Sequence, residues 1–382
     1  MYSKIQAVDL FCGAGGLTRG LLDAGIDVRA GVDSNGDCKY AYSHNNEGVT
    51  FINKSVTELT ANEVSRLFEP LHTRLLCGCA PCQTFSSMNQ KDEDGRRKDG
   101  RWTLLLEFGR LVREVRPELV TMENVPGIER TDVFESFLAI LEDEGYHVDH
   151  KVIDCSLYGM PQRRHRLVLL GSLLGEIRVP TPEEWGARPT TVREAIGELP
   201  TISAGQTDPE DMLHSSSSLS DLNLRRIRAS VPGGTWRQWD EALVLPCHGK
   251  KEGDGYGAVY GRMEWDKPAP TITTQFYNYG SGRFGHPEQD RAISLREGAI
   301  LQGFPRGYQF EDPHKRLGRR ALGMMIGNAV PVGLAKLIGT TLRRHVDETS
   351  GIASDMKGHR ESWEIMDVPQ VRQGAPAEEA DA

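Results

Sequence analysis

Cys82 and Glu123 have the side chains best suited to nucleophilic and acid–base chemistry, and each follows a short apolar run. Cys82 lies in the bend after a predicted strand at 75–78, which would present its thiol. A free thiol has a pKa of about 8.5 and is mostly protonated at neutral pH, so the arginine-rich loop that follows or a substrate phosphate would have to tune it. A lone cysteine is more often a small buried apolar residue. Glu123 ends the predicted strand at 119–122 and is expected to reach the same cleft.

Gln162, Arg164 and Arg166 form a second group of polar side chains. In an extended segment, alternation places them on one face, with Arg163 and His165 on the other. Polar groups that converge on one face just before an apolar strand suit the recognition of an anion or a base better than they suit a core.

A glycine-rich turn follows the first predicted strand, at residues 9–16. Gly13, Gly15 and Gly16 let the backbone turn tightly and approach a ligand, at the strand end where open α/β sheets bind ligands. The spacing departs from the Gly-x-Gly-x-x-Gly pattern of dinucleotide enzymes, and a tight turn without a ligand is the alternative. Asp33, at the end of the second strand, could accept hydrogen bonds from ribose hydroxyls or cap the next helix.

These side chains converge only if a parallel sheet brings the strand ends together. Up to about residue 170, strands and helices alternate in the way that builds such a sheet. Strands are predicted at 5–10, 28–32, 75–78, 119–122, 146–154 and 166–171, and helices at 17–24, at 102–115 and from a capping-box-like start at Asp132 and Glu135. Regular patterns fade between 174 and 290, which indicates a separate loop-rich domain. Helices return at 295–301 and 332–344.

The charge distribution leaves room for a polyanionic partner. The 382 residues carry a formal net charge of −9. Residues 347–382 hold nine acidic and three basic residues, so the rest of the chain carries only −3, and we expect the acidic tail to be disordered. Local patches decide whether a polyanion binds, and basic clusters occur at 96–101, 163–166, 225–228 and 316–320. A solvated face is the alternative for each cluster.

Cysteine usage and apolar patterning argue against a secreted or membrane protein. Seven cysteines, an odd number, do not suggest a disulfide framework, so we expect a reducing cytoplasm. No Cys/His spacing typical of zinc follows residues 77–82, and no metal is expected. No apolar run approaches the roughly 18 residues of a membrane span, and the first residues lack the apolar stretch of a signal peptide.

In their order along the chain, these motifs resemble those of the cytosine-C5 DNA methyltransferase family. The resemblance implies an α/β fold, with a Rossmann-like S-adenosylmethionine-dependent methyltransferase domain that has a mostly parallel sheet, and a smaller loop-rich target-recognition domain. It rests on the loop at 9–16, Pro81-Cys82-Gln83, Glu123-Asn124-Val125, the Gln-x-Arg-x-Arg at 162–166, and later motifs at 296–305 and 327–331.

The resemblance also implies domain boundaries and a cofactor. Residues 1–173 would begin the catalytic domain, 174–290 would form the target-recognition domain, and 291–346 would return to the catalytic domain with a C-terminal helix. Asn328 is far from the other cofactor residues in sequence, so the terminal helix must pack back beside the first strand. The implied contacts to S-adenosyl-L-methionine are Phe11, Gly13, Gly15, Asp33, Ser55, Pro81, Leu104 and Asn328.

The implied reaction is methylation of cytosine at C5. The Cys82 thiolate would attack C6, Glu123 would contact N3 and the exocyclic amine, and Arg164 and Arg166 would contact the base O2 and a phosphate. The base must leave the duplex first, because methyltransferases cannot reach the target atom of a base that is stacked inside the helix. Double-stranded DNA is the implied partner, with contacts from Gln83, Ser86, Arg96, Arg97, Arg101, Arg225, Arg228 and Arg262.

The chain departs from the family pattern near the adenine site and before the nucleophile. Ser55 stands where an Asp usually binds the adenine amine, so adenine binding would be looser, or Asn53 would substitute. Cys79 and Ala80 replace the commoner small residue and proline in front of Pro81.

The alternatives are a tRNA cytosine-5 methyltransferase and a non-catalytic DNA-binding relative. The tRNA branch carries a Cys-Phe-Thr signature that this sequence lacks, and non-catalytic relatives lose the Cys82 or Glu123 that are both present here. A dehydrogenase would explain neither residues 162–166 nor Asn328. A bacterial enzyme of this size is expected to act as a monomer and to protect DNA within a restriction or other defence system, and a solitary regulatory enzyme is the alternative.

Overall fold

The computed structural model describes residues 5–81, 103–248 and 257–351. The strands are β1 (Ile5–Leu10), β2 (Asp27–Asp33), β3 (Thr50–Asn53), β4 (Thr73–Gly78), β5 (Leu119–Asn124), β6 (His147–Asp154), β7 (Gln162–Arg163), β8 (His165–Ser172) and β9 (Ala269–Pro270). The helices are α1 (Gly16–Asp23), α2 (Cys38–Asn45), α3 (Ala61–Ser65), α5 (Leu104–Val115), α6 (Asp132–Asp143), α7 (Pro182–Trp185), α8 (Val192–Ile196), α9 (Asp221–Ala229), α10 (Leu295–Leu301), α11 (Arg319–Asn328) and α12 (Val332–Thr349).

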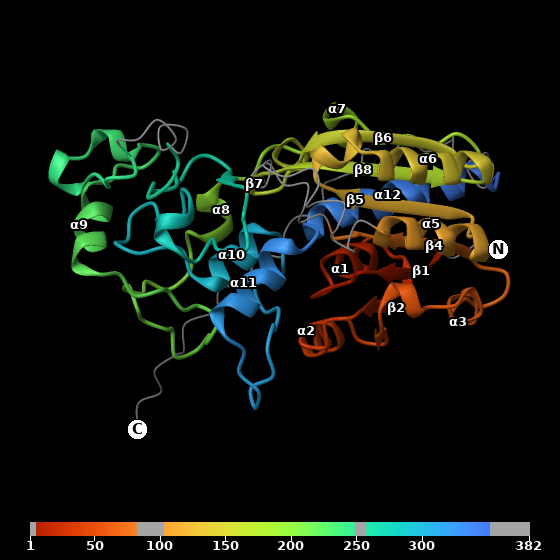
Figure 1. The fold of residues 1–382 in the computed structure, drawn as a ribbon, viewed down its shortest axis with the longest axis horizontal. Helices are drawn as coiled ribbons and strands as arrows, with labels where there is room; N and C mark the ends of the chain where they lie inside the picture. Colours follow the sequence, from red (N-terminus) through yellow and green to blue (C-terminus); the bar gives the residue numbers. More distant parts are fainter. Residues whose placement is uncertain (1–4, 82–102, 249–256, 352–382) are drawn as a thin grey trace, which may run out of the picture.

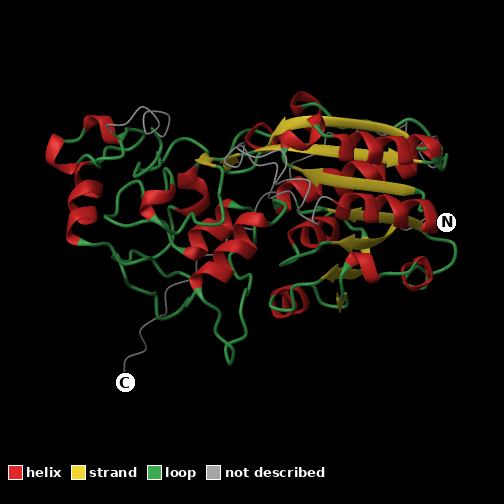
Figure 2. Ribbon diagram, viewed as in Figure 1, coloured by secondary structure: helices red, strands yellow, loops and turns green. Residues whose placement is uncertain are grey.

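A seven-stranded sheet in the order β3-β2-β1-β4-β5-β8-β6 forms the centre of one lobe (Figures 1 and 2). Strands β1 to β5 run parallel, which confirms the predicted mostly parallel sheet, and β8 runs antiparallel to both β5 and β6. Only a short helical turn, Cys155–Tyr158, and β7 separate β6 from β8. A parallel return would need a crossover of about a dozen residues or more, so the short connection accounts for the reversal.

Helices cover both faces of the sheet, because neighbouring residues in each buried strand point to opposite sides. On one side, Ala7 and Leu75 pack with apolar residues of α1 and α12. On the other side, Val8 and Leu76 pack with apolar residues of α5 and α6. The strand ends that carry polar residues are thus held on a rigid three-layer scaffold.

Helix α6 begins at a different cap from the predicted one. Thr131, rather than Asp132, occupies the N-cap position, and its hydroxyl accepts a hydrogen bond from the Phe134 amide (3.4 Å). A short side chain directly before the first turn can reach the third amide of the helix, which a residue inside the turn cannot.

Helix α12 returns to the sheet from the end of the described chain and packs on α1. The two helices touch at Gly20, where an added Cβ would lie 2.3 Å from the Ala335 Cβ. The position of Asn328 in the sequence predicted that the terminal helix packs back in this way. By length and composition alone, the helical stretch Arg319–Thr349 could cross a membrane, but 67% of its apolar window is buried in the fold.

A second lobe contains α8 to α11 and few strands (Figure 1). Residues with little regular structure need other partners for their backbone groups, and buried arginines provide them here. Arg262 donates to the backbone oxygens of Ile227, Ser230, His286 and Gln289.

Hydrophobic contacts connect the residues on either side of positions 174 and 291. Ile177, Val179 and Trp185 still belong to the core beneath the sheet. Helices α10 and α11 contribute to a core shared with residues 263–284 of the second lobe and with Ala14 and Ala41 of the first.

Candidate active site

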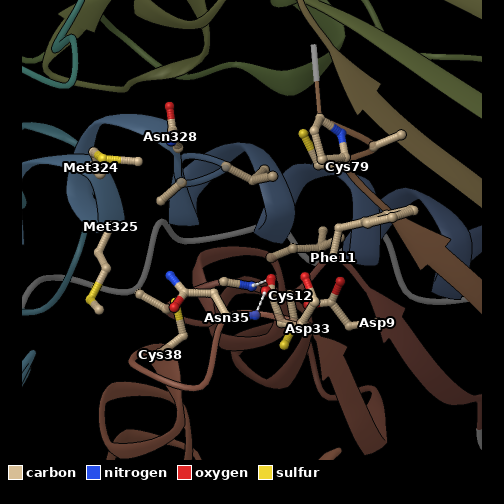
Figure 3. Close-up of a pocket in the computed structure, with 18 of the residues that line it drawn as sticks. Asp9, Phe11, Cys12, Asp33, Asn35, Cys38, Cys79, Met324, Met325 and Asn328 are labelled. Atoms are coloured by element: carbon tan, nitrogen blue, oxygen red, sulfur yellow. Dashed lines mark hydrogen bonds between the residues drawn. The ribbon is translucent and has the colours of Figure 1, made fainter. Parts of the chain in front are cut away.

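A cavity of about 460 Å³ lies at the carboxyl ends of β1, β2, β3 and β4 (Figure 3). Its walls are the loops that follow these strands, Leu104 at the start of α5, and residues 321–330 around the end of α11. Open α/β sheets bind ligands at this edge because the loops after parallel strands converge there.

The loops after β1 and β2 are tied together at the bottom of the cavity. Phe11 and Gly13 have left-handed backbone conformations, with φ of 60° and 51°. The Gly13 amide donates to Asp33 Oδ2 (2.8 Å), and the Asn35 amide donates to Asp33 Oδ1 (2.8 Å), as the dashed lines in Figure 3 show. Asp33 does not cap α2, because Asp37 occupies that helix's N-cap position.

Most of the predicted cofactor residues line this cavity, namely Phe11, Gly13, Asp33, Ser55, Pro81, Leu104 and Asn328. Gly15 is not part of the lining. It is the N-cap residue of α1 with φ of 90°, and an added Cβ would lie 2.7 Å from Asn46 Nδ2, so packing and backbone conformation require glycine there. The Ser55 hydroxyl is engaged in a hydrogen bond with Thr57 Oγ1 (2.7 Å) at the start of a helical turn.

Asp9 lines the cavity as well, although the family resemblance implied no cofactor contact for it. Its Oδ2 accepts a hydrogen bond from Thr18 Oγ1 (2.7 Å), whereas its buried Oδ1 has no hydrogen-bond partner among the described residues. Burial raises the pKa of Asp9 to about 7, with the charge of Asp33 adding to the effect and the Thr18 bond opposing it. An acidic residue in a mostly apolar strand, just before a glycine-rich turn, was the signal in the sequence for a polar group at this cavity.

Glu123 lies beside the cavity at the end of β5 and is only 3% exposed. Its Oε1 is 2.8 Å from Arg166 Nε, and its Oε2 accepts a hydrogen bond from the Cys79 thiol (2.9 Å). Asn124 Nδ2 donates to the Ala80 oxygen (3.2 Å), which joins the end of β5 to the segment that leads into residue 82. The structure therefore brings Glu123 and Arg166 together next to residues 79–81 of the cavity wall.

Gln162 and Arg164 share a buried face, as the alternation predicted, while the residues that follow each of them are exposed. At Arg164 that face points into the protein. The guanidinium is 3% exposed and donates to the Ile272 oxygen (2.8 Å) and the Gly327 oxygen (3.0 Å). The geometry does not support the predicted contact between Arg164 and the base, because both terminal nitrogens hold the end of α11 and the second lobe against the sheet.

Arg164→Met is expected to lower the free energy of unfolding by about 3 kcal/mol, since two buried carbonyl oxygens would lose their donors. Arg164→Lys retains the charge but not the fork of donors, so its loss should be intermediate. Denaturant unfolding monitored by circular dichroism measures both. Arg163→Met, on the exposed face, should change stability by no more than about 0.5 kcal/mol. Equal losses at positions 163 and 164 would contradict the bracing role of Arg164.

The predicted DNA-binding arginines of the second lobe differ in their exposure and in their partners. Arg225 is exposed on α9. Arg228 is exposed and forms an ion pair with Asp290 (3.0 Å). Arg262 is 5% exposed and bound to backbone oxygens and to Asp290, so its predicted DNA contact is corrected to a structural role. The remaining predicted residues, Cys82, Gln83, Ser86, Arg96, Arg97 and Arg101, lie outside the described residues.

Comparison with known proteins decides the family. The profile of C-5 cytosine-specific DNA methylases matches residues 5–344. The chain belongs to this family. This methylase is 50% identical over 343 residues to the Type II methylase M.HgiDII of Herpetosiphon aurantiacus, a match that covers 89% of this chain and 95% of that protein. It is 31% identical to the Type II methyltransferase M1.BsuMI of Bacillus subtilis, over 88% of this chain and 79% of the relative.

Solved structures show the same fold. A putative DNA modification methyltransferase encoded within an E. coli prophage matches this methylase with a TM-score of 0.69 at 22% identity, covering 90% of this chain and 100% of that one. DNMT2 of Spodoptera frugiperda matches with a TM-score of 0.61 at 16% identity, covering 90% and 99%. The family profile and the Type II relatives identify this methylase as a DNA (cytosine-5-)-methyltransferase, and members of its family use S-adenosylmethionine.

Proposed function

We propose that this methylase modifies C5 of a cytosine held outside the duplex, within a short DNA sequence, as the modification member of a Type II restriction–modification system. The observation that carries the proposal is the buried Glu123–Arg166 pair, beside both the cavity and the segment leading into Cys82. A carboxylate and a guanidinium placed together suit a polar heterocycle with donors and acceptors on one edge. The Type II names of the relatives at 50% and 31% identity support the biological role.

We propose that the cavity beside this pair holds S-adenosylmethionine. An added Cβ at Gly13 would meet no atom within 4 Å, so the backbone there is open to a ligand. Phe11 offers an aromatic surface, and Asp9 Oδ1, which has no hydrogen-bond partner within the described part of the chain, suits a cationic group. Asn328 would contact the cofactor from α11. When bound, the cofactor supplies the methyl group that becomes attached to cytosine C5.

The affinity for S-adenosylmethionine should rise several-fold between pH 6 and pH 8, because Asp9, whose pKa is about 7, then becomes a carboxylate that attracts the cationic cofactor. Titration calorimetry at both pH values measures this. Asp9→Asn should bind weakly at both, and Asp143→Asn, at an exposed site on α6, should behave like the wild type. A wild-type affinity that does not change with pH would contradict this role of Asp9.

In the protein without cofactor, ionisation of Asp9 lowers the free energy of unfolding. The folded-state pKa of Asp9 is raised from 3.8. Its stabilising contribution to the free energy of unfolding is therefore fully present below about pH 4 and is lost as the pH rises through about 7. The cofactor would therefore favour the ionised form that folding disfavours.

The proposed chemistry takes place on the base. The Cys82 thiolate adds to C6 and forms a sulfur–carbon bond, which makes C5 nucleophilic. A proton taken up from solvent reaches N3 through Glu123 as the negative charge develops on the ring, and Arg166 contacts the base O2. After methylation, C5 loses its proton to solvent, N3 gives its proton back through Glu123, and the C6–sulfur bond breaks, which restores the aromatic ring and the thiolate.

Double-stranded DNA is the proposed substrate. Removing a base from the stack costs a few kcal/mol, which contacts to the DNA backbone must offset. We assign residues 174–290 to target recognition, where Arg225 is exposed and able to reach a phosphate or base. We propose that the methylase is a cytoplasmic monomer and that it acts alongside a cognate restriction enzyme.

The test is to express the methylase in a host that lacks cytosine methylation and to map 5-methylcytosine across the genome and the tRNA. Methylation of one short DNA motif is the expected result. Modified tRNA with unmodified DNA would favour the RNA alternative. A folded protein that binds DNA without modifying it would favour a non-catalytic role.

A further inference from the structure

Cys79 places a thiol against the carboxylate on which the proposed reaction depends. It directly follows β4, and the last residue of β4, Gly78, pairs with Met122 of β5. Cys79 and Glu123 are therefore neighbours at the ends of adjacent parallel strands. The Cys79 Sγ lies 2.9 Å from Glu123 Oε2 and donates a hydrogen bond to it.

The two oxygens of Glu123 have different surroundings. Oε2 is held by the thiol, whereas Oε1 is buried and has no hydrogen-bond partner among the described residues, although Arg166 Nε is 2.8 Å away. The arginine contributes its charge without an aligned donor. One oxygen is thus fixed, and the other is left to meet a group on the substrate.

We infer that Cys79 is a positioning residue for methyl transfer, whose thiol holds one oxygen of Glu123 so that the other faces the target base. The inference rests on the proposed role of Glu123. The thiol must carry its proton to act in this way, because a thiolate at this distance from a carboxylate would be repelled by it. Cys79 also lines the cavity, so a bound cofactor would lie against the residue that orients the carboxylate.

The experiment compares Cys79→Ala, Cys79→Ser and Glu123→Gln in the full chain, with Cys247→Ala at an exposed cysteine as the matched control. Single-turnover methyl transfer at saturating DNA and S-adenosylmethionine reports the chemical step. Equilibrium titrations give the two affinities, and thermal unfolding reports stability. Cys79→Ala should lower the single-turnover rate about tenfold, the value of one hydrogen bond to a charged group, with both affinities and the melting temperature close to the wild type.

Cys79→Ser should recover most of the rate, because a hydroxyl also donates to the carboxylate. A merely structural role would instead lower the melting temperature and would not separate rate from affinity. Wild-type rates in Cys79→Ala, together with slow transfer in Glu123→Gln, would overturn the inference about Cys79 alone. Equal losses in the Ala and Ser variants would also overturn it. Fast transfer in Glu123→Gln would overturn the proposed role of Glu123 itself.

Discussion

Cys82→Ala is expected to reduce methyl transfer by at least about 10⁴-fold, the scale on which enzymes lose activity when a nucleophile is removed. Without the thiolate, C6 has no partner for bond formation and C5 stays part of an aromatic ring. Transfer of a labelled methyl group from S-adenosylmethionine to DNA measures the loss. DNA containing 5-fluorocytosine adds a second readout, since C5 then has no proton to lose and the wild type should remain covalently attached.

The matched control is Cys247→Ala, because Cys247 is exposed in the second lobe. It should retain wild-type transfer and form the covalent complex. Cys82→Ala should still bind DNA and cofactor but form no covalent complex. Transfer within tenfold of the wild type in Cys82→Ala would rule out Cys82 as the nucleophile.

Glu123→Gln is expected to slow the chemical step by a factor of about 10²–10⁴, the usual contribution of a general acid or base. Glutamine keeps the size and planar shape of the side chain, so packing at the end of β5 should change little. It cannot deliver a proton to N3 as the thiolate adds, and it removes the charge that faces Arg166. Single-turnover kinetics with saturating DNA isolate this step from binding.

Glu135→Gln, at an exposed position of α6, is the control for the loss of one carboxylate and should behave like the wild type. DNA affinity should be similar in both variants. A rate for Glu123→Gln within about threefold of the control would mean that the carboxylate does not take part in proton transfer.

Local patterns in the sequence predicted six of the seven strands of the sheet in their order along the chain, but not the short edge strand β3. Buried strands such as β1 and β5 are short apolar runs, and α5 shows its buried face as regular spacing of leucine and phenylalanine. The reversal of β8 was not visible in this way, because strand direction depends on how the chain connects β6 to β8 rather than on either strand's own residues.

Residues that follow parallel strands must meet at one edge of the sheet, so the strand ends could be predicted to share a cleft. The family resemblance implied cofactor contacts for Phe11, Asp33 and Pro81, and the structure places all three in the wall of one cavity. Asn328 required the family resemblance, since nothing local in α11 indicates that it packs beside β1.

The sequence by itself determined the family, the strand ends and the residue types available for chemistry, because motifs and periodicity are properties of neighbouring residues. Only the tertiary structure decided which polar side chains face the site. Arg164 and Arg262 look like ligands for an anion in the sequence, but both satisfy buried carbonyl oxygens. In the sequence Cys79 only replaces the commoner small residue of the family, but in the structure it contacts Glu123. The partner of a polar group is set by what lies opposite it in space, and in these cases that partner belongs to another element.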